Sequence, residues 1–355
     1  MNLKQLFIMK MIYTLNRKLI LSKLNVDSFN TITDNLGWSL YFYYLSRWEV
    51  NPKYKFVADD FLNRVIEQIS DINDITVETG LAGVALGMSH LVREKYVEGD
   101  INEILEEVDN AIFKKLVFLE YKNGVKPIPK ADLILLLYYL YIRYRECKSL
   151  ENKYFFQELT IRTLEMLNEN LQDEFFKENI NYSLLNYNLP LFLRVISKIY
   201  KLNIYNYRID KILDRNINVI LSSYPVLHAN RLFLLYGLIS IKPCLIKFVK
   251  EFESHIKLLK SNIDINYILY EEFNNQNVYI LDGISSVYMM LYSLKKEYPN
   301  YSFNFNPQLI YTRVSHSDVW NRMLNNDFYF DKHCKLLDGY LGVYLTMLHI
   351  KRSFL

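Results

Sequence analysis

The chain has 355 residues, 51% of them apolar, so it can bury a sizeable core in one large domain or in two ordinary ones. Its 42 basic and 39 acidic residues nearly balance and form no long basic block, which excludes a nucleic-acid-binding face. The three cysteines are scattered and odd in number, which excludes a disulfide framework and indicates a reducing compartment.

The N-terminal stretch, residues 3–23, is apolar but is interrupted by several lysines and an arginine. It lacks the unbroken apolar core and small-residue cleavage site of a signal peptide. The longest apolar run, Leu133 to Ile142, is far too short to cross a bilayer. We therefore expect a cytoplasmic protein that has no membrane span.

Helical spacing recurs along the chain at a period of roughly 45–55 residues, which is typical of helical arrays. Each period contains an amphipathic helix, a loop and a more apolar helix. The expected amphipathic helices cover residues 3–23, 56–70, 100–119, 151–171, 207–223, 243–262 and 305–325. The expected apolar helices include Trp38–Leu45, Val84–Leu91, Leu133–Tyr144, Leu191–Tyr200, Leu232–Ile241, Val287–Leu294 and Val343–Ile350. The pattern predicts a double layer with the apolar helices inside. No linker interrupts it, so residues 1–355 are predicted to form one domain.

A short glycine motif stands before three of the apolar helices. Its members are Gly80 with Gly83, Gly339 with Gly342, and Gly283 with Ser286 in place of the second glycine. The first glycine suits a sharp turn, and the second lets a neighbouring backbone come close. Thr79 or Glu78 is expected to cap the helix that follows. In the first period Gly37 takes the place of Gly83, so a helix is expected to begin near it.

With seven helix pairs and repeated Gly-x-x-Gly turns, the chain resembles the lanthionine synthetase C-like (LanC-like) family. The resemblance runs over most of the chain and is best at residues 78–99, 281–294 and 336–348. It implies an all-α fold, an α/α toroid of about seven inner and seven outer helices. It also implies a place in the maturation of lanthipeptide-type natural products, with a peptide substrate or a modifying enzyme as the partner.

The family's cyclases bind Zn²⁺ through a Trp-Cys-Tyr-Gly loop and a Cys-His-Gly loop, and the ion holds the attacking thiolate of the substrate. This sequence has Leu281-Asp282-Gly283 and Leu227-His228-Ala229 where those loops belong. Asn186 and Tyr187 stand where a catalytic histidine would be. We therefore predict no zinc cofactor, and a pseudo-cyclase that binds a precursor peptide or a modifying partner.

Two alternatives remain open. The first is an active cyclase or transferase of the same family that uses altered residues such as His228, Asp282 or the pair His333 and Cys334. The second is a carbohydrate-active α/α toroid in which Asp282 and Asp338 serve as general acid and base. These aspartates occupy equivalent positions in successive periods and are expected at the same end of the ring, together with Glu78 and Asp132. All of these acidic residues also suit helix N-caps, and His228 suits a loop or capping histidine.

His333 and Cys334 are the adjacent His–Cys pair of the chain and are candidate metal ligands, with a distant His228 as a third donor. The alternative is a loop pair that ends an outer helix. Cys147 and Cys244 are expected to pack as core residues.

Aromatic residues are abundant, with 30 tyrosines, and several of these lie on the expected inner helices. Such tyrosines either line a central cavity that grips a peptide or a sugar, or fill the core. The tyrosines concerned are Tyr43, Tyr44, Tyr138, Tyr139, Tyr141, Tyr288, Tyr292 and Tyr344. His90 is expected to be a core histidine bonded to a neighbouring helix, and His349 has no distinguishing context.

Overall fold

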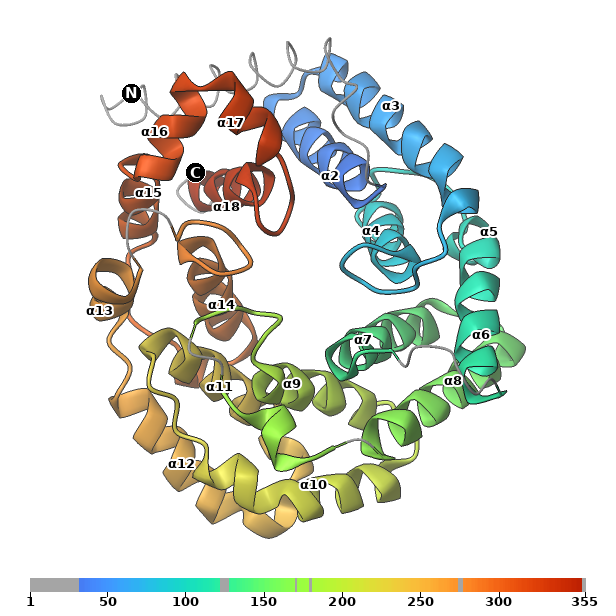
Figure 1. Ribbon diagram of the computed structural model, residues 1–355, viewed down its shortest axis with the longest axis vertical. Coiled ribbons are helices and arrows are strands. Elements are labelled where there is room, and N and C mark those ends of the chain that lie inside the picture. The colour runs from blue at the N-terminus through green and yellow to red at the C-terminus, as the bar shows by residue number, and fades with distance from the viewer. Residues whose placement is uncertain (1–31, 122–127, 170, 179–180, 274–276, 353–355) are drawn as a thin grey trace.

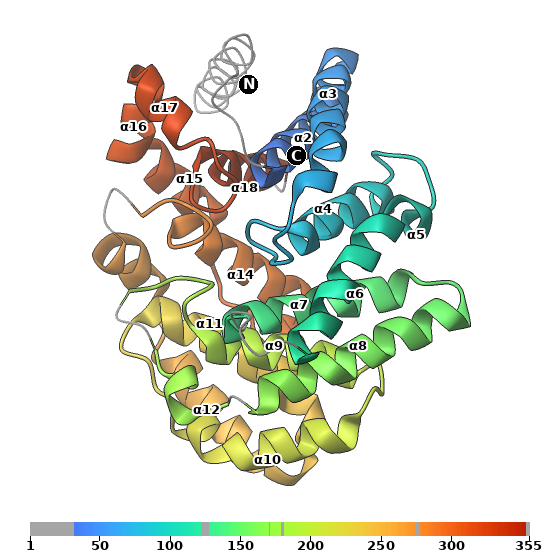
Figure 2. The same ribbon diagram turned by 45° about the vertical axis from the view of Figure 1, so that its right-hand side comes forward.

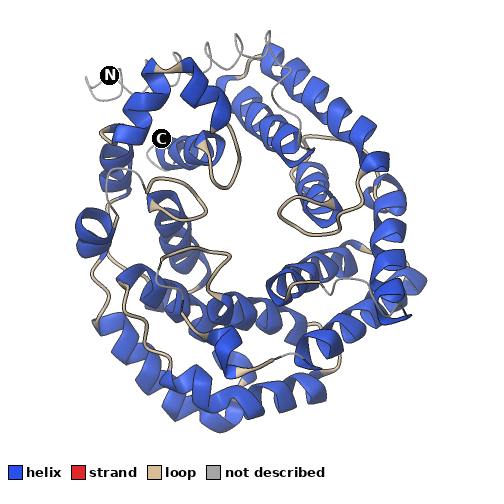
Figure 3. Cartoon of the chain, viewed as in Figure 1, coloured by secondary structure: helices blue, strands red, loops and turns tan. Residues whose placement is uncertain are grey.

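The computed structural model describes residues 32–121, 128–169, 171–178, 181–273 and 277–352. Every regular element in these ranges is a helix (Figure 3). The prediction of an all-α fold is confirmed.

In the described part of the chain, seven inner helices surround the centre of the molecule, and Figure 1 shows their arrangement. They are α2 (Ile32–Glu49), α4 (Leu81–Arg93), α7 (Lys130–Glu146), α9 (Asn188–Tyr200), α11 (His228–Ile241), α14 (Ile284–Glu297) and α18 (Tyr340–Arg352). Each packs against the next in the chain, and α18 packs against α2. That last contact closes the ring.

An outer layer follows the perimeter, and Figure 2 shows it from a second side. Its helices are α3 (Pro52–Gln68), α5 (Ile101–Ile104), α6 (Glu106–Tyr121), α8 (Leu150–Glu169), α10 (Asn206–Ser222), α12 (Val249–Ser261), α13 (Ile265–Tyr267), α15 (Pro307–Ser315), α16 (Asp318–Asn325) and α17 (Asp327–Lys332). A π-helical turn, η5 (Ile268–Glu272), continues α13. The α/α toroid is confirmed, but two expected outer helices are divided: the one at 100–119 into α5 and α6, and the one at 305–325 into α15 and α16. The outer helix expected at 3–23 lies outside the described residues.

The two layers differ in how they bury their side chains. Helix α11 is buried on nearly all sides because it packs against α9, α14 and α12. Helix α12 buries a single stripe, at Phe252, His255, Ile256 and Leu259. The apolar surface of the inner helices is therefore buried in contacts within the ring. None of the described helices is both long and apolar enough to span a bilayer.

The first glycine of each motif ends a loop that turns back onto the helix. We call these loops, together with the loops before α9 and α11 that have no such glycine, the rim loops. They precede α4, α9, α11, α14 and α18 and cover residues 72–80, 181–187, 223–227, 277–283 and 333–339. The Leu81 amide donates to the Asp74 carbonyl at 2.9 Å, and the Tyr340 amide donates to the His333 carbonyl at the same distance. Gly80 is the N-cap and has no side-chain cap, so the expected caps Thr79 and Glu78 are wrong. Main-chain carbonyls satisfy the free amides of the first turn instead.

The second glycine lets a rim loop lie against the first turn of its helix. A Cβ atom at Gly83 would stand 2.0 Å from the Val77 carbonyl oxygen, and one at Gly342 would stand 2.1 Å from the Leu336 carbonyl oxygen. Gly37 has another role, because α2 has already begun at Ile32. A Cβ there would lie 2.8 Å from Leu341 Cδ2, so Gly37 is the spacer at which α18 meets α2, and not the start of a helix.

Candidate functional site

The rim loops before α9, α14 and α18 are joined by main-chain hydrogen bonds. The Leu184 amide donates to the Leu281 carbonyl at 2.9 Å, and the Leu281 amide donates to the Leu337 carbonyl at 2.9 Å. The Ser286 hydroxyl donates to the Gly283 carbonyl at 2.7 Å, so the Tyr182 hydroxyl is the donor in its own 2.7 Å bond to Ser286 Oγ. The peptide groups at position 281, where the resemblance puts a cysteine ligand, are thus hydrogen-bonded to two other rim loops.

Asp282 and Asp338 lie at the same end of the ring, as expected. Burial raises the pKa of Asp282, and the nearby Asp338 carboxylate raises it further. Asp338 is exposed and lies 3.6 Å from Lys335. Gly283 is the N-cap of α14, so Asp282 does not have the capping role offered as its alternative. In the described part of the chain, its buried Oδ1 has no hydrogen-bond partner.

Asp132 is half-buried in the first turn of α7, whose N-cap is Pro129. Burial raises the pKa of its carboxyl group, with smaller contributions from Asp74 and Glu78. The expectation that Glu78 and Asp132 share one end of the ring is consistent with this interaction. The Asp132 side chain is not the helix cap.

His228 faces the outer layer. Its Nδ1 accepts a hydrogen bond from the Asp264 amide at 3.0 Å, and its ring centroid lies 4.8 Å from that of Tyr267. Among the described residues, the His228 imidazole ring makes these two contacts and none with Asp282. The structure therefore places His228 in the first turn of α11, where its ring joins that helix to the connection before α13.

Two glutamates that the sequence analysis missed occupy the N-terminus of α11. Glu272 accepts from the His228 amide at 2.5 Å and from the Ala229 amide at 2.9 Å. Glu178 accepts from Asn230 Nδ2 at 2.7 Å. Carboxylates stabilise a helix N-terminus because its free amides carry partial positive charge. Both glutamates come from other repeats, so no local signal in the sequence reveals them.

His333 and Cys334 face different neighbours. Cys334 is 2% exposed, and its Sγ donates to the Phe330 carbonyl at 2.8 Å. The His333 ring lies 4.4 Å from the Tyr329 ring, and burial lowers its pKa. Neither residue contacts His228 in the described ranges.

The other two cysteines follow the far ends of inner helices. Cys147 caps the C-terminus of α7 and Cys244 follows the C-terminus of α11; both are buried. Burial raises each thiol pKa to about 11, which disfavours the thiolate that binds zinc.

The donor set does not fit a zinc ion. All six histidines and all three cysteines lie within the described residues. Across those residues, no three His, Cys, Asp or Glu side chains come together as a metal site would require. His333 and Cys334 lie in the rim loop before α18 but belong to no such group of three; the absence of zinc stays a prediction.

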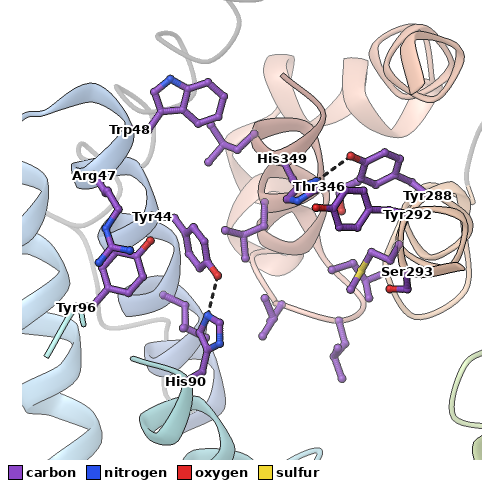
Figure 4. Close-up of a pocket in the computed structure, with 17 residues that line it drawn as sticks. Tyr44, Arg47, Trp48, His90, Tyr96, Tyr288, Tyr292, Ser293, Thr346 and His349 are labelled. Carbon is purple, nitrogen blue, oxygen red and sulfur yellow. Dashed lines mark hydrogen bonds between the residues drawn. The ribbon is translucent and has the colours of Figure 1, made fainter. Parts of the chain in front are cut away.

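A cavity of about 660 Å³ lies between α2 and α4 on one side and α14 and α18 on the other (Figure 4). We call it the central cavity. Side chains of the rim loops, among them Ile280 and Leu336, form one part of its wall. Arg47 is exposed at its edge, and Met289 and Tyr292 are 45% and 38% exposed. A solvent-accessible cavity of this size suits a small molecule or a few residues of a peptide.

Each wall of the central cavity carries a tyrosine–histidine pair (Figure 4). The Tyr44 hydroxyl lies 2.7 Å from His90 Nε2, and the Tyr288 hydroxyl lies 2.8 Å from His349 Nδ1. Tyr292 meets the His349 ring edge-on, at 4.4 Å between centroids. The expectation that His90 bonds a neighbouring helix is confirmed. His349 was missed, because the sequence does not show which face of α18 meets α14.

The expected tyrosines divide between the two roles that the sequence left open. Three line the central cavity: Tyr44, Tyr288 and Tyr292. Others fill the core, among them Tyr139 and Tyr344, which are 0% and 2% exposed.

Comparison with solved structures finds nisin cyclase, with a TM-score of 0.61 and 13% sequence identity over 96% of this chain and 94% of that chain. No protein-family model matches the chain. No curated protein sequence matches it either. At this identity the likeness shows the fold alone. The chain has the LanC-like fold, as its glycine turns predicted.

Proposed function

We propose that this chain is a divergent LanC-like protein of modified-peptide maturation that does not carry out zinc-dependent cyclisation and binds a peptide in its central cavity. Nisin cyclase, which shares the fold over nearly all of both chains, is by its name a cyclase of nisin. The chain keeps the toroid and a solvent-accessible cavity in its centre. A modifying enzyme is the other partner that this role allows.

One observation carries the loss of cyclisation. The soft donors of the described residues do not converge on one point: Cys334 donates to the Phe330 carbonyl, and His228 accepts from the Asp264 amide. Activation of a thiol by zinc needs thiolate or imidazole ligands and one open coordination position. Position 281, where the resemblance puts a cysteine ligand, carries a leucine side chain, which has no donor atom for a metal.

The test uses a fluorescent linear peptide that contains one dehydrobutyrine and one cysteine. We expect it to bind the full-length protein, and its cysteine to remain alkylatable by iodoacetamide with or without added zinc. Tyr292→Ala, inside the central cavity, should weaken binding by about tenfold. Tyr207→Ala is the matched control because Tyr207 is 69% exposed on α10. Loss of the free thiol, together with one tightly held zinc per chain, would instead establish the active cyclase.

A second candidate rests on the pair Asp282 and Asp338. A carboxyl group whose pKa is raised by burial, beside an exposed carboxylate, is the arrangement that glycoside hydrolysis uses. This candidate predicts release of nitrophenol from a nitrophenyl glycoside, and loss of that release in Asp282→Asn. Binding of the peptide with no hydrolysis of glycosides supports the first function over the second.

A further inference from the structure

The lining of the central cavity is unbalanced in charge. Among the described residues that line it, Arg47 is charged, His90 and His349 contribute imidazole rings, and there is no aspartate or glutamate. A ligand that complements this lining carries a negative charge or strong hydrogen-bond acceptors.

Arg47 is held in place by main-chain carbonyls, and no carboxylate of the described residues pairs with its charge. Its Nη2 donates to the main-chain carbonyls of Glu94 at 2.6 Å and Lys95 at 3.2 Å. Its guanidinium carbon lies 3.7 Å from the centroid of the Tyr96 ring. Among the described residues it makes no other hydrogen bond or ion pair. The Nε and Nη1 donors stay free among the described residues, and since they lie on opposite edges of the guanidinium, a carboxylate accepts a single charge-assisted hydrogen bond from one of them.

The Tyr44 hydroxyl also has a free proton, and the reason lies in His90. Arg93 Nη2 is 3.1 Å from His90 Nδ1, and a guanidinium can only donate, so Nδ1 accepts. Burial and Arg93 both lower the His90 pKa, so the ring is neutral and carries its proton on Nε2. That Nε2–H donates to the Tyr44 oxygen at 2.7 Å. The tyrosine oxygen thus accepts from the protein and can donate to a ligand.

The rest of the central cavity is apolar. Leu40, Leu345 and Leu348 on the inner helices and Ile280 on a rim loop contribute to it. A ligand that fills it places apolar side chains against these residues. The combination of one polar corner and a large apolar surface selects an amphipathic ligand.

We infer that the central cavity binds a peptide segment in which a carboxylate stands beside bulky apolar side chains. The carboxylate meets Arg47 and the Tyr44 hydroxyl, and the apolar side chains meet the leucines. The inference deepens the proposed function and rests on it, since it names the chemistry of the peptide. The carboxylate has two sources, the C-terminus of a peptide and an acidic side chain.

The test measures fluorescence anisotropy with three labelled tetrapeptides. They are Leu-Phe-Leu-Phe with a free C-terminus, the same peptide as its amide, and Leu-Phe-Glu-Phe amide. We expect at least one carboxylate peptide to bind about tenfold more tightly than the neutral amide. Preference for the first indicates a C-terminal carboxylate, and preference for the third indicates an acidic side chain. Equal binding of all three overturns the inference.

Variants locate the effect. Arg47→Gln should remove the preference, so that the carboxylate peptide and the neutral amide bind alike, whereas Arg47→Lys should keep part of the preference. Tyr44→Phe, which deletes only the hydroxyl, should reduce the preference by about threefold. Arg64→Gln is the control because Arg64 lies on α3 and pairs with Asp60 at 3.4 Å. A preference that survives Arg47→Gln contradicts the inference.

The same data separate the two proposals. If the neutral amide binds as tightly as the acids and Tyr292→Ala abolishes that binding, the cavity binds peptides without recognising a carboxylate. If none of the three tetrapeptides binds and the peptide with dehydrobutyrine and cysteine also fails to bind, the proposed function itself fails.

Discussion

Arg143 and Asp109 form a buried ion pair that ties inner helix α7 to outer helix α6. Arg143 Nη2 lies 2.7 Å from Asp109 Oδ2, and the two side chains are 1% and 10% exposed. Arg143 Nε is 3.0 Å from the same oxygen, and the Tyr139 hydroxyl donates to the other carboxylate oxygen. A buried charge that is fully paired in this way costs most when one partner is removed.

Arg143→Met should therefore lower the free energy of unfolding by about 3–5 kcal/mol, because it leaves the Asp109 carboxylate buried without a cation. Adding Asp109→Asn removes the charge and keeps an acceptor for Tyr139. The double variant should recover about 2 kcal/mol of that loss. Urea unfolding followed by circular dichroism measures both values. A double variant no more stable than the single one would show that the pair matters through packing alone.

The close approach at Gly83 predicts a second stability difference. Gly83→Ala puts a methyl group into the Val77 carbonyl, which is main chain and cannot turn aside, so it should cost about 1–3 kcal/mol. Gly87→Ala is the matched control in the same helix. Its Cβ would meet the Leu36 side chain, which can rotate, and alanine gains about 1 kcal/mol of helix propensity. Thermal unfolding that ranks Gly87→Ala below Gly83→Ala contradicts this account.

Most of the fold could be predicted from the sequence because the ring is built of similar helix pairs. An apolar helix buried on both sides and an amphipathic helix buried on one have different patterns, and both recur at a fixed period. The start of α2 was misplaced because a glycine that spaces two helices, as Gly37 does, cannot be told from one that turns the chain. Thr79 was misassigned as a cap because the carbonyl that caps the first amide, at Asp74, comes from a folded-back loop.

The site was less predictable because its contacts join distant repeats. The sequence indicated that the cysteine ligands of the family's cyclases are absent from residues 227–229 and 281–283. It could not indicate that Glu272 covers the start of α11, or that His349 faces Tyr288. Such pairings depend on which faces of two helices meet across the ring.

The three cysteines should be unreactive in the native protein. Cys147 and Cys244 are buried and their thiol pKa values are raised to about 11, and Cys334 is buried with its Sγ bonded to Phe330. Alkylation by iodoacetamide at pH 7.5 should be more than about a hundredfold slower than in urea, where all three thiols react. Mass spectrometry identifies the modified peptides. A native thiol that reacts at once would mean that one cysteine reaches solvent and is free to serve as a ligand.

Buried histidines should make the protein less stable as the pH falls. Burial lowers the folded-state pKa of His90 and of His255, whereas in the unfolded chain both have a pKa near 6.5. Below that pH the unfolded chain takes up protons that the folded chain does not, so the free energy of unfolding declines until the folded-state pKa is passed. Urea unfolding at pH 7.5 and pH 5.5 measures the decline.

His255→Leu isolates one of these groups. His255 lies in the buried stripe of α12 and bonds the main chain of Ser223, while its Nε2 has no partner among the described residues. At pH 7.5 the variant should lose about 1 kcal/mol, because the Ser223 main chain is left without its hydrogen bond. Between pH 7.5 and pH 5.5 the variant should lose less stability than the native protein, since leucine takes up no proton. An equal loss in both proteins would mean that His255 takes up its proton in the folded state as readily as in the unfolded one, and that burial on α12 does not keep the ring neutral.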